Sequence, residues 1–312
     1  MKIDAETGAE GVAAIPGKTF FDLVRALPDG QVTLTREGNN LIIAYNNSQT
    51  MLNGYPAETF PEPPAAATDV EFVMSGEKFK EMYRGVSYAI SNDKSRPVFT
   101  GVLFDLKGGR LRMVATDTHR LAYKEASVQT DEEAQAVVPG GALDKTVSLL
   151  SGETVVLSLG RTYLKASTVD ATVTLRLIAG VFPSYENIIP KEFRSEIIIG
   201  RGKLEDALKR AVLLADETPV ARFVFQDGAL LVEMGSSLGS LKESLAVEKT
   251  GDNMDLYFNC AYILDAIRCI ETEKVVLKLT SPLSAALVLP SDQNNSLSLL
   301  LPARPKEEEA AA

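Results

Sequence analysis

The chain has 312 residues, of which 45% are hydrophobic, and its formal net charge at neutral pH is −10. A chain of this length and composition exceeds one ordinary domain and has enough apolar residues to exclude general disorder. The acidic balance argues against a protein that coats nucleic acid with its whole surface, although a local basic lining remains compatible with it. The sequence has no long apolar run and no basic-then-apolar start, so we expect a cytoplasmic protein with no membrane partner.

Five helices are predicted along the chain, at a spacing of about sixty residues. They begin near Gly17, Gly76, Gly140, Gly202 and Asn259. In the second and fourth segments apolar residues recur at helical spacing, so each helix presents one apolar stripe to a core. These stripes are Phe79, Met82, Tyr83 and Val86 in the second segment and Leu204, Leu208, Ala211 and Leu214 in the fourth.

Extended runs of apolar residues, cut by Gly, Asn, Pro or Ser, follow the predicted helices. Clear examples are QVTLTREG before NNLIIAYNN, ETVVLSLG before RTYLKAS, and KVVLKLT before SAALVLP. Such runs with short turns predict antiparallel strands. The fold class is therefore predicted as α+β, in repeated units whose helices lie on one face of antiparallel sheets. Alternating single strands and helices, which are typical of a doubly wound parallel fold, are absent.

The repeated units are expected to pair into domains. The second and third units predict a domain at 69–193, and the fourth and fifth predict one at 194–305. The first unit, 1–64, has no mate, so we interpret it as the second half of a domain whose first half is missing. The stretch 61–68 (PEPPAAAT) reads as a linker. Residues 306–312 form a charged tail that is expected to be disordered.

Motifs for catalysis and metal binding are weak in this sequence. Cys260 and Cys269 lie nine positions apart in one predicted helix, on different faces, which favours packing over a disulfide or a metal site. His119 stands beside Asp117 and Arg120. It is a general base, a turn histidine held by hydrogen bonds, or part of the rim of a peptide groove. We expect no catalytic residue, no metal and no cofactor.

The predicted helices carry a net positive charge, whereas the rest of the chain is strongly acidic. This segregation suggests that one helix-lined surface faces phosphates. Solvated helix faces with internal ion pairs have a similar composition, so this alternative stays open. No base-reading motif is visible, and any contact with double-stranded DNA should be independent of sequence. The candidate DNA-facing residues are Lys18, Arg25, Lys80, Arg84, Lys203, Lys209 and Arg210.

One segment resembles a known family closely. The stretch 91–126 (SNDKSRPVFTGVLFDLKGGRLRMVATDTHRLAYKEA) is similar to the middle-domain signature of the bacterial sliding clamps, the DNA polymerase III beta subunits. The stretches GYPAETFP (54–61), VFPSYENIIP (181–190) and FNCAYILDAI (258–267) resemble other parts of that family. The resemblance covers nearly all of residues 1–305.

The resemblance implies a clamp fold and a non-enzymatic processivity factor. In that family two chains close head to tail into a ring, with helices lining the hole and sheets outside. The implied partners are duplex DNA, the DNA polymerase III alpha subunit, the clamp loader and other proteins with clamp-binding motifs. The chain would thus belong to the replicative polymerase holoenzyme, as a truncated member of the family or a truncated paralogue.

The resemblance also implies two kinds of site. A cleft for partner peptides would use Phe99, Thr116, His119, Arg120, Leu121, Pro183, Ile188, Asn259, Tyr262, Leu283, Leu301 and Pro302. Ring closure would use Thr50 and Leu52 of one chain with Leu213 and Leu214 of the other.

Two departures from the family pattern bear on the cleft. Thr118 replaces the usual Gly, which is tolerable only if the turn does not need a positive φ. Ala303 replaces a Met, which would weaken peptide binding. The alternative function is a clamp-derived peptide-binding or regulatory module that no longer encircles DNA. A further alternative is an unrelated enzyme that uses His119.

Overall fold

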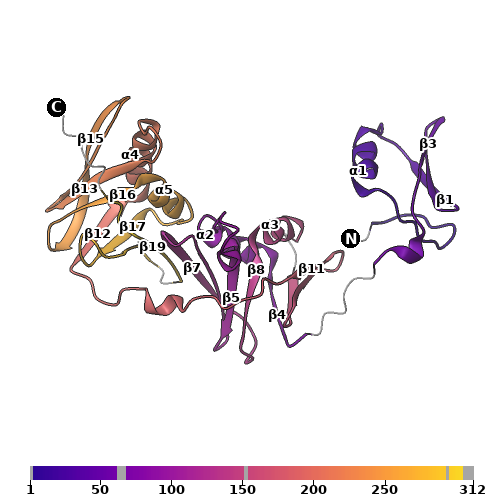
Figure 1. Ribbon diagram of the computed structural model, residues 1–312, viewed down its shortest axis with the longest axis horizontal. Coiled ribbons are helices and arrows are strands. Elements are labelled where there is room, and N and C mark those ends of the chain that lie inside the picture. Colours follow the sequence, from indigo (N-terminus) through magenta and orange to yellow (C-terminus); the bar gives the residue numbers. More distant parts are fainter. Residues whose placement is uncertain (1–2, 62–67, 151–153, 293–294, 305–312) are drawn as a thin grey trace. The chain divides into compact units, whose positions relative to one another are not determined.

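The computed structural model describes residues 3–61, 68–150, 154–292 and 295–304, and the chain divides into two compact units (Figure 1). The smaller unit is Lys2–Ala65, and the larger unit begins at Ala66. Most of the predicted linker and all of the predicted acidic tail lie outside the described residues. No helix in the described ranges has the length and apolar character that a membrane crossing requires.

The smaller unit contains one helix and one antiparallel sheet. Helix α1 (Gly17–Ala26) precedes strands β1 (Val32–Glu37), β2 (Asn40–Tyr45) and β3 (Ser48–Leu52), which pair in that order, and a 3₁₀ turn η1 (Ala57–Thr59). Ile43 on the central strand is buried, whereas α1 buries none of its residues. Phe21 and Leu34 are exposed apolar side chains of this unit.

The larger unit has four α-helices among its described residues: α2 (Gly76–Ser87), α3 (Gly140–Leu149), α4 (Arg201–Leu213) and α5 (Cys260–Arg268). All begin within one residue of the predicted starts. Ser75 and Asn259 cap α2 and α5 by accepting backbone hydrogen bonds from Lys78 and Ala261, because a side-chain oxygen can satisfy the free N–H groups of a helix start. The predicted stripes on α2 and α4 face the core, and all their residues except the partly buried Leu214 are fully buried.

The strands of the larger unit form two antiparallel sheets. The first has the order β11-β10-β9-β4, with β4 (Val70–Ser75), β9 (Thr154–Leu159), β10 (Tyr163–Ser167) and β11 (Thr172–Arg176). The second has twelve strands in the order β16-β13-β14-β15-β12-β17-β18-β19-β7-β6-β5-β8. The bounds of its strands are β5 (Gly101–Lys107), β6 (Arg110–Thr116), β7 (Arg120–Ser127), β8 (Ala134–Pro139), β12 (Ser195–Gly200), β13 (Val220–Gln226), β14 (Ala229–Ser236), β15 (Gly239–Gly251), β16 (Met254–Asn259), β17 (Lys274–Leu279), β18 (Ala286–Pro290) and β19 (Ser296–Leu300). The predicted α+β class with antiparallel sheets is confirmed.

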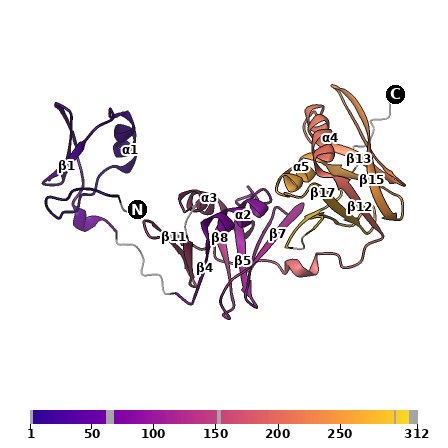
Figure 2. The same cartoon turned by 180° about the vertical axis from the view of Figure 1, so that it is seen from behind.

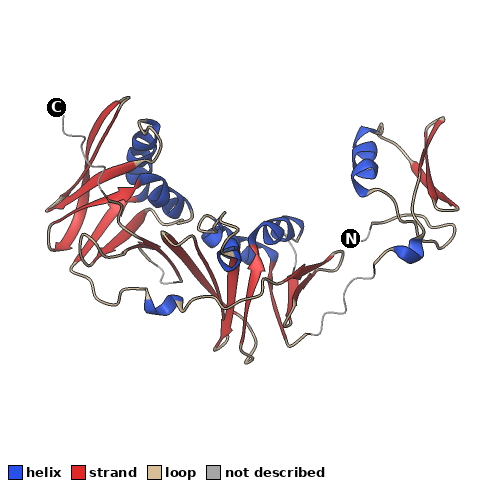
Figure 3. Ribbon diagram, in the orientation of Figure 1, coloured by secondary structure: helices blue, strands red, loops and turns tan. Residues whose placement is uncertain are grey.

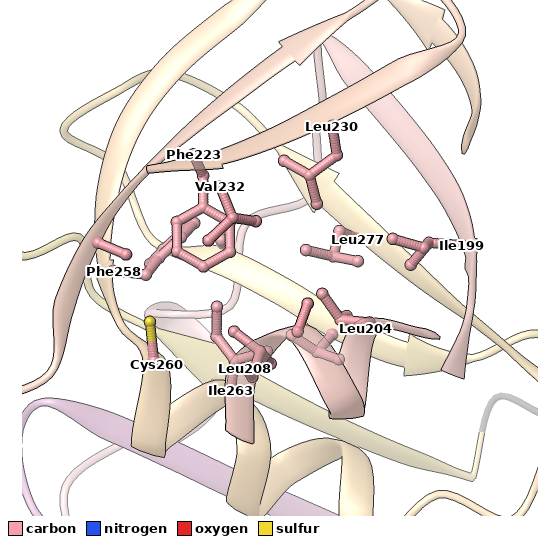
Figure 4. Packing of buried hydrophobic residues seen from close by; sticks show 14 of the residues in the cluster. Ile199, Leu204, Leu208, Phe223, Leu230, Val232, Phe258, Cys260, Ile263 and Leu277 are labelled. Atoms are coloured by element: carbon pink, nitrogen blue, oxygen red, sulfur yellow. The ribbon is translucent and has the colours of Figure 1, made fainter. Parts of the chain in front are cut away.

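Two lobes share the twelve-stranded sheet: a middle lobe, Val70–Arg176, and a C-terminal lobe, Ser195–Leu300. Each lobe has its own core between helices and strands. In the C-terminal lobe, Leu208 of α4 and Ile263 of α5 point toward Phe223 and Val232 on the sheet (Figure 4). In both lobes the helices lie on one side of the strands (Figure 3).

The lobes join where β7 of the middle lobe pairs with β19 of the C-terminal lobe, with Leu121 opposite Leu299. From behind, β7 lies between β5 and the strands of the C-terminal lobe (Figure 2). The Tyr88 hydroxyl at the end of α2 forms a short hydrogen bond with the Ser298 hydroxyl on β19. A third apolar cluster, the junction cluster, includes Leu121, Leu287 and Leu299. The junction is therefore built from backbone pairing, a polar link and an apolar core.

Candidate functional site

Arg120, at the start of β7, connects the two lobes. Its Nε donates a hydrogen bond to Asp117 Oδ2 at 3.0 Å, and its Nη1 donates one to Asp265 Oδ2 on α5 at 2.8 Å. The guanidinium lies 4.3 Å from the centre of the Tyr262 ring, within cation–π range. Burial lowers the pKa of Arg120, but Asp265 and Asp117 outweigh this and raise it, so the side chain stays charged.

The turn before Arg120 is held by its own polar side chains. Asp117 Oδ1 accepts hydrogen bonds from the backbone N–H groups of His119 and Arg120. The Thr116 hydroxyl donates to the Arg120 carbonyl at 2.7 Å and accepts from the Thr118 N–H. Thr118 has φ 76°, so this turn uses a positive φ. The condition for tolerating a threonine at this position, a negative φ, is therefore not met. The backbone of this turn is therefore strained.

The segment after β19 crosses the junction and is anchored on both lobes. The Leu301 N–H donates to the His119 carbonyl at 2.9 Å, and the Ala303 N–H donates to the Tyr257 carbonyl at 2.7 Å. The Leu301 side chain is 44% exposed, and Pro302 between these anchors is partly buried. The sequence-predicted residues His119, Arg120, Tyr262 and Leu301 therefore meet at one place.

A second group of predicted residues surrounds an apolar cavity of about 260 Å³. Phe99 and Pro183 line it, together with Arg96, Pro97, Val98 and Val181. The Phe99 ring packs edge-on against Phe182, with ring centres 6.1 Å apart. Val98 and Phe182 also pack against the junction cluster, which includes Leu121 and Leu299. The second group therefore lies over the junction cluster, whereas Tyr262 of the first group packs against the core of the C-terminal lobe.

The remaining cleft candidates differ in exposure. Leu121 is 1% exposed, so it belongs to the floor of the site rather than to its surface. Ile188 is 54% exposed just after the 3₁₀ turn η3 (Tyr185–Asn187). Asn259 caps α5, which gives it a structural task. Leu283 is 91% exposed in the turn before β18 and, like Ile188, belongs to none of the three apolar clusters, so its place in the cleft stays a prediction.

Sequence reasoning missed two residues that hold Arg120. Asp265 accepts its hydrogen bond, and the Tyr88 ring lies 5.4 Å from its guanidinium. Asp265 stands three positions after Tyr262, on the same face of α5, and this spacing was a usable signal. Tyr88 gave no such signal, because it lies on a different helix and reaches Arg120 only through the fold.

The candidate DNA-facing residues divide by their ion pairs. Lys209 binds Glu205 at 2.9 Å, and Arg210 binds Glu243 at 2.5 Å. Their charges are therefore partly neutralised by the protein. The other candidates form no ion pair within the described ranges: Lys18 and Arg25 on α1, Lys80 and Arg84 on α2, and Lys203 on α4. Arg25 lies 5.6 Å from the centre of the Phe21 ring.

The geometry gives little support to a catalytic role for His119 or to a metal site at the two cysteines. Within the described part of the chain, His119 forms hydrogen bonds through its backbone N–H and carbonyl groups. In the part of the chain that the structure describes, no group of three or more His, Cys, Asp and Glu residues is placed to hold a metal ion. Both cysteines are free, and burial raises the pKa of the Cys260 thiol to about 12. These observations favour a packing role for both cysteines.

The candidate ring-closure residues lie on two separate elements. Thr50 and Leu52 are on β3 and are partly buried. Leu213 is exposed at the end of α4, and Leu214 after it is partly buried.

Three models of one protein family match successive parts of the chain. The DNA polymerase III beta subunit N-terminal domain matches residues 1–64, its central domain matches 73–184 and its C-terminal domain matches 186–304. The chain belongs to the DNA polymerase III beta subunit family. The family resemblance read from the sequence is thereby confirmed.

The proteins similar to this beta subunit are beta sliding clamps or DNA polymerase III beta subunits, and they match nearly the whole chain. It is 28% identical to the beta sliding clamp of Pseudomonas aeruginosa, over 97% of this chain and 85% of that protein. The solved Thermotoga maritima beta subunit is 26% identical with a TM-score of 0.87, over 93% of this chain and 81% of that one. A solved Pseudomonas aeruginosa clamp bound to griselimycin is 28% identical with a TM-score of 0.89, over the same shares. The function of this beta subunit is that of a DNA sliding clamp.

The matches span 97% of this chain and 85% of the Pseudomonas aeruginosa clamp, and the N-terminal domain model matches residues 1–64. The expectation of a truncated member of the family stays a prediction.

Proposed function

We propose that two copies of this chain close a ring around duplex DNA and that the ring tethers replication proteins to the duplex. Enclosure then holds the DNA, so contacts with phosphates are weak and independent of sequence. In this proposal the chain acts in the cytoplasm, catalyses no reaction itself and needs no cofactor. The domains are those expected from the sequence: 1–64, 69–193 and 194–305.

The charges on the helices support a DNA-facing role. The helices of the larger unit lie on one side of its strands (Figure 3). Lys80, Arg84 and Lys203 project from α2 and α4 without an ion pair in the described ranges, so their charges are available for phosphates. Lys18 and Arg25 on α1 join them in this proposal. Lys209 and Arg210 contribute less, because each is already paired with a carboxylate.

The observation that carries the tethering proposal is the junction cluster, which lies beneath the cavity at Phe99 and contains Leu121 and Leu299. Val98 lines the cavity beside Phe99, and Leu299 directly precedes the Leu300–Leu301 segment. Both belong to or pack against the junction cluster. Such a surface fits a short peptide with a few apolar anchors. The proposed partners are the DNA polymerase III alpha subunit, the clamp loader and other proteins with clamp-binding motifs.

Ring closure is proposed between β3 of one copy and the end of α4 of the other. Leu213 is exposed there, and Thr50, Leu52 and Leu214 are partly accessible. Apolar residues of this kind are suited to a homodimer interface.

The ring proposal is tested on circular DNA. The chain is loaded with its clamp loader onto a singly nicked circular plasmid, and the complex is isolated by gel filtration. We expect the chain to stay with the circle and to leave after a restriction enzyme linearises it, because a ring slides off a free end. Retention on the linear product would mean adhesion and would contradict enclosure. Binding of peptides without retention on circles would favour the alternative of a peptide-binding module.

The cleft is tested with a fluorescein-labelled hexapeptide that carries two leucines and a phenylalanine as apolar anchors. We expect Ile188→Ala and Leu301→Ala each to weaken its binding roughly tenfold, as measured by anisotropy. Both side chains are partly exposed, so the substitutions should spare folding. Leu238→Ala, in the exposed turn between β14 and β15, is the matched control and should bind like the wild type. Equal binding by all three variants would contradict the cleft assignment.

A further inference from the structure

The segment between the lobes, residues 177–194, carries two of the proposed cleft residues, Pro183 and Ile188. We call it the strap. Its ends are fixed by backbone hydrogen bonds: the Ile178 N–H donates to the Val137 carbonyl at 2.8 Å, and the Arg194 N–H donates to the Leu279 carbonyl at 2.9 Å. Within 181–188 most side chains are exposed, and Tyr185 is the one buried residue. Tyr185 is therefore the most deeply buried attachment of the middle of the strap, beside Phe182 and Ile189, which pack against the junction cluster.

The sheet beneath the strap contains a buried carboxylate. Asp105 on β5 is 3% exposed. Its neighbours on the adjacent strands are Arg112 on β6 and Gln135 on β8, each directly opposite in register. Gln135 Nε2 donates to Asp105 Oδ1 at 2.8 Å, and Arg112 Nη1 lies 3.7 Å from Oδ2. The sheet thus gives one carboxylate oxygen a hydrogen bond and leaves the other with a distant cation.

The strap supplies the missing donor. The Tyr185 hydroxyl donates to Asp105 Oδ2 at 2.7 Å, and its ring packs 6.0 Å from the centre of the Tyr123 ring. Burial, followed by the hydrogen bond to Asp105, raises the pKa of Tyr185, so the hydroxyl keeps its proton. A buried carboxylate oxygen without a donor is costly, which makes this contact a strong local restraint. Arg112 also lies 3.5 Å from Glu186 on the strap, but Glu186 is exposed, so this pair is the weaker attachment.

We propose that Tyr185 is a positioning residue of the peptide cleft: by bonding Asp105 it fixes the strap and so places Pro183 and Ile188 for the partner peptide. The inference rests on the proposed peptide-binding function and deepens it. Pro183 lies two residues before Tyr185 and Ile188 three residues after it, so one restraint controls both exposed apolar side chains. Tyr185 acts through these residues and does not itself contact the peptide.

The test compares Tyr185→Phe with Tyr123→Phe. Tyr123 is a matched control, because its hydroxyl also donates to a carboxylate oxygen, Glu125 Oε2, at 2.6 Å. Unlike Tyr185, it does not belong to the strap, since Tyr123 and Glu125 both lie on β7. We expect Tyr185→Phe to weaken binding of the fluorescein-labelled hexapeptide roughly fivefold. It should also speed hydrogen exchange of the backbone amides of 186–189. Tyr123→Phe should change the affinity by less than about twofold.

A double-mutant cycle separates positioning from general destabilisation. If Tyr185 acts through Ile188, Tyr185→Phe adds less than about twofold to the loss already caused by Ile188→Ala. The full loss in the Ile188→Ala background would overturn the inference, as would wild-type affinity of the Tyr185→Phe variant. If the wild-type chain does not bind the hexapeptide at all, the proposed function and the inference fall together. If the wild type binds and only the Tyr185→Phe effect is missing, the inference alone falls.

Discussion

Thr118 has a backbone conformation that its own side chain disfavours. A β-branched side chain at φ 76° is rarely populated, since its Cβ crowds the neighbouring carbonyl groups. The conformation persists because Asp117 and Thr116 satisfy the backbone groups of the turn. Strain held in this way next to Arg120 sets the direction in which His119 and Arg120 leave the turn.

Replacing this threonine should relieve the strain. We expect Thr118→Gly to raise the free energy of unfolding by about 1 kcal/mol, the balance of relieved strain and a more flexible unfolded chain. Urea unfolding at neutral pH measures it. Asn46→Gly is the control, because Asn46 has φ 48° but asparagine tolerates this region, so its effect should be close to zero. A Thr118→Gly variant less stable than the wild type would show that the turn is not strained.

Single residues of the site could be predicted only where a motif marks them. The series around Arg120 and the tyrosine at 262 were readable from the sequence, and the structure brings them to within 4.3 Å. The positive φ of Thr118 was not readable, because the side chain alone favours the opposite conformation. The burial of Leu121 was not readable either, because it depends on pairing with β19, which is far along the chain.

Among the elements, α2 and β7 are joined by an ion pair that responds to acid. Glu81 Oε1 binds Lys124 Nζ on β7 at 2.7 Å, and its other oxygen binds Lys78 at 2.8 Å. Burial raises the pKa of Glu81, but the bonds to Lys124 and Lys78 outweigh it and hold the pKa below the ordinary value of 4.5. A carboxylate with a lowered folded pKa stabilises the fold above its ordinary pKa. That stability is lost as the pH falls through the folded pKa.

This sign leads to a prediction for Glu81→Gln. The variant should be less stable than the wild type at pH 7. The gap should begin to shrink as the pH falls below 4.5 and should close once the pH is below the lowered folded pKa, where the wild-type carboxyl is itself protonated. Urea unfolding across this pH range measures both. Glu77→Gln on the same helix is the control, since Glu77 is exposed and makes no ion pair within the described ranges. A gap that stays constant down to pH 3 would contradict the assigned pKa direction.

The elements themselves could largely be predicted, whereas their long-range pairing could not. The start of each described α-helix could be predicted from a glycine or asparagine that precedes an apolar segment, because both signals are local in the sequence. The partner of β7 is β19, and nothing local in either strand specifies the other. The sequence marked the strap only by its resemblance to a family motif. Its attachment to the sheet could not be predicted, because it depends on Asp105, and an aspartate is ordinarily expected at the solvent-exposed surface.

At the scale of the whole molecule, the two units differ in how much they bury. The larger unit has three apolar clusters, while in the smaller unit the buried apolar residues among those described are Ala14, Leu41 and Ile43. Resistance to local opening depends on buried apolar contacts. The strands of the smaller unit should therefore open more readily.

Hydrogen exchange measures this difference directly. We expect the amides of β2 to exchange at least about tenfold faster than those of β13, although both are central strands with partners on each side. The two strands are compared in one sample at one pH, so that intrinsic exchange rates can be corrected. Equal protection would mean that the smaller unit gains stability from a second copy or another partner.

The pairing of β7 with β19 also has a consequence for synthesis of the chain. While the ribosome is still making the C-terminal lobe, the middle lobe has all its own strands, but the edge of β7 has no partner until residues 296–300 emerge. An open apolar edge invites pairing with other nascent chains. Release of the final strand therefore both completes the sheet and removes the site at which premature aggregation would begin.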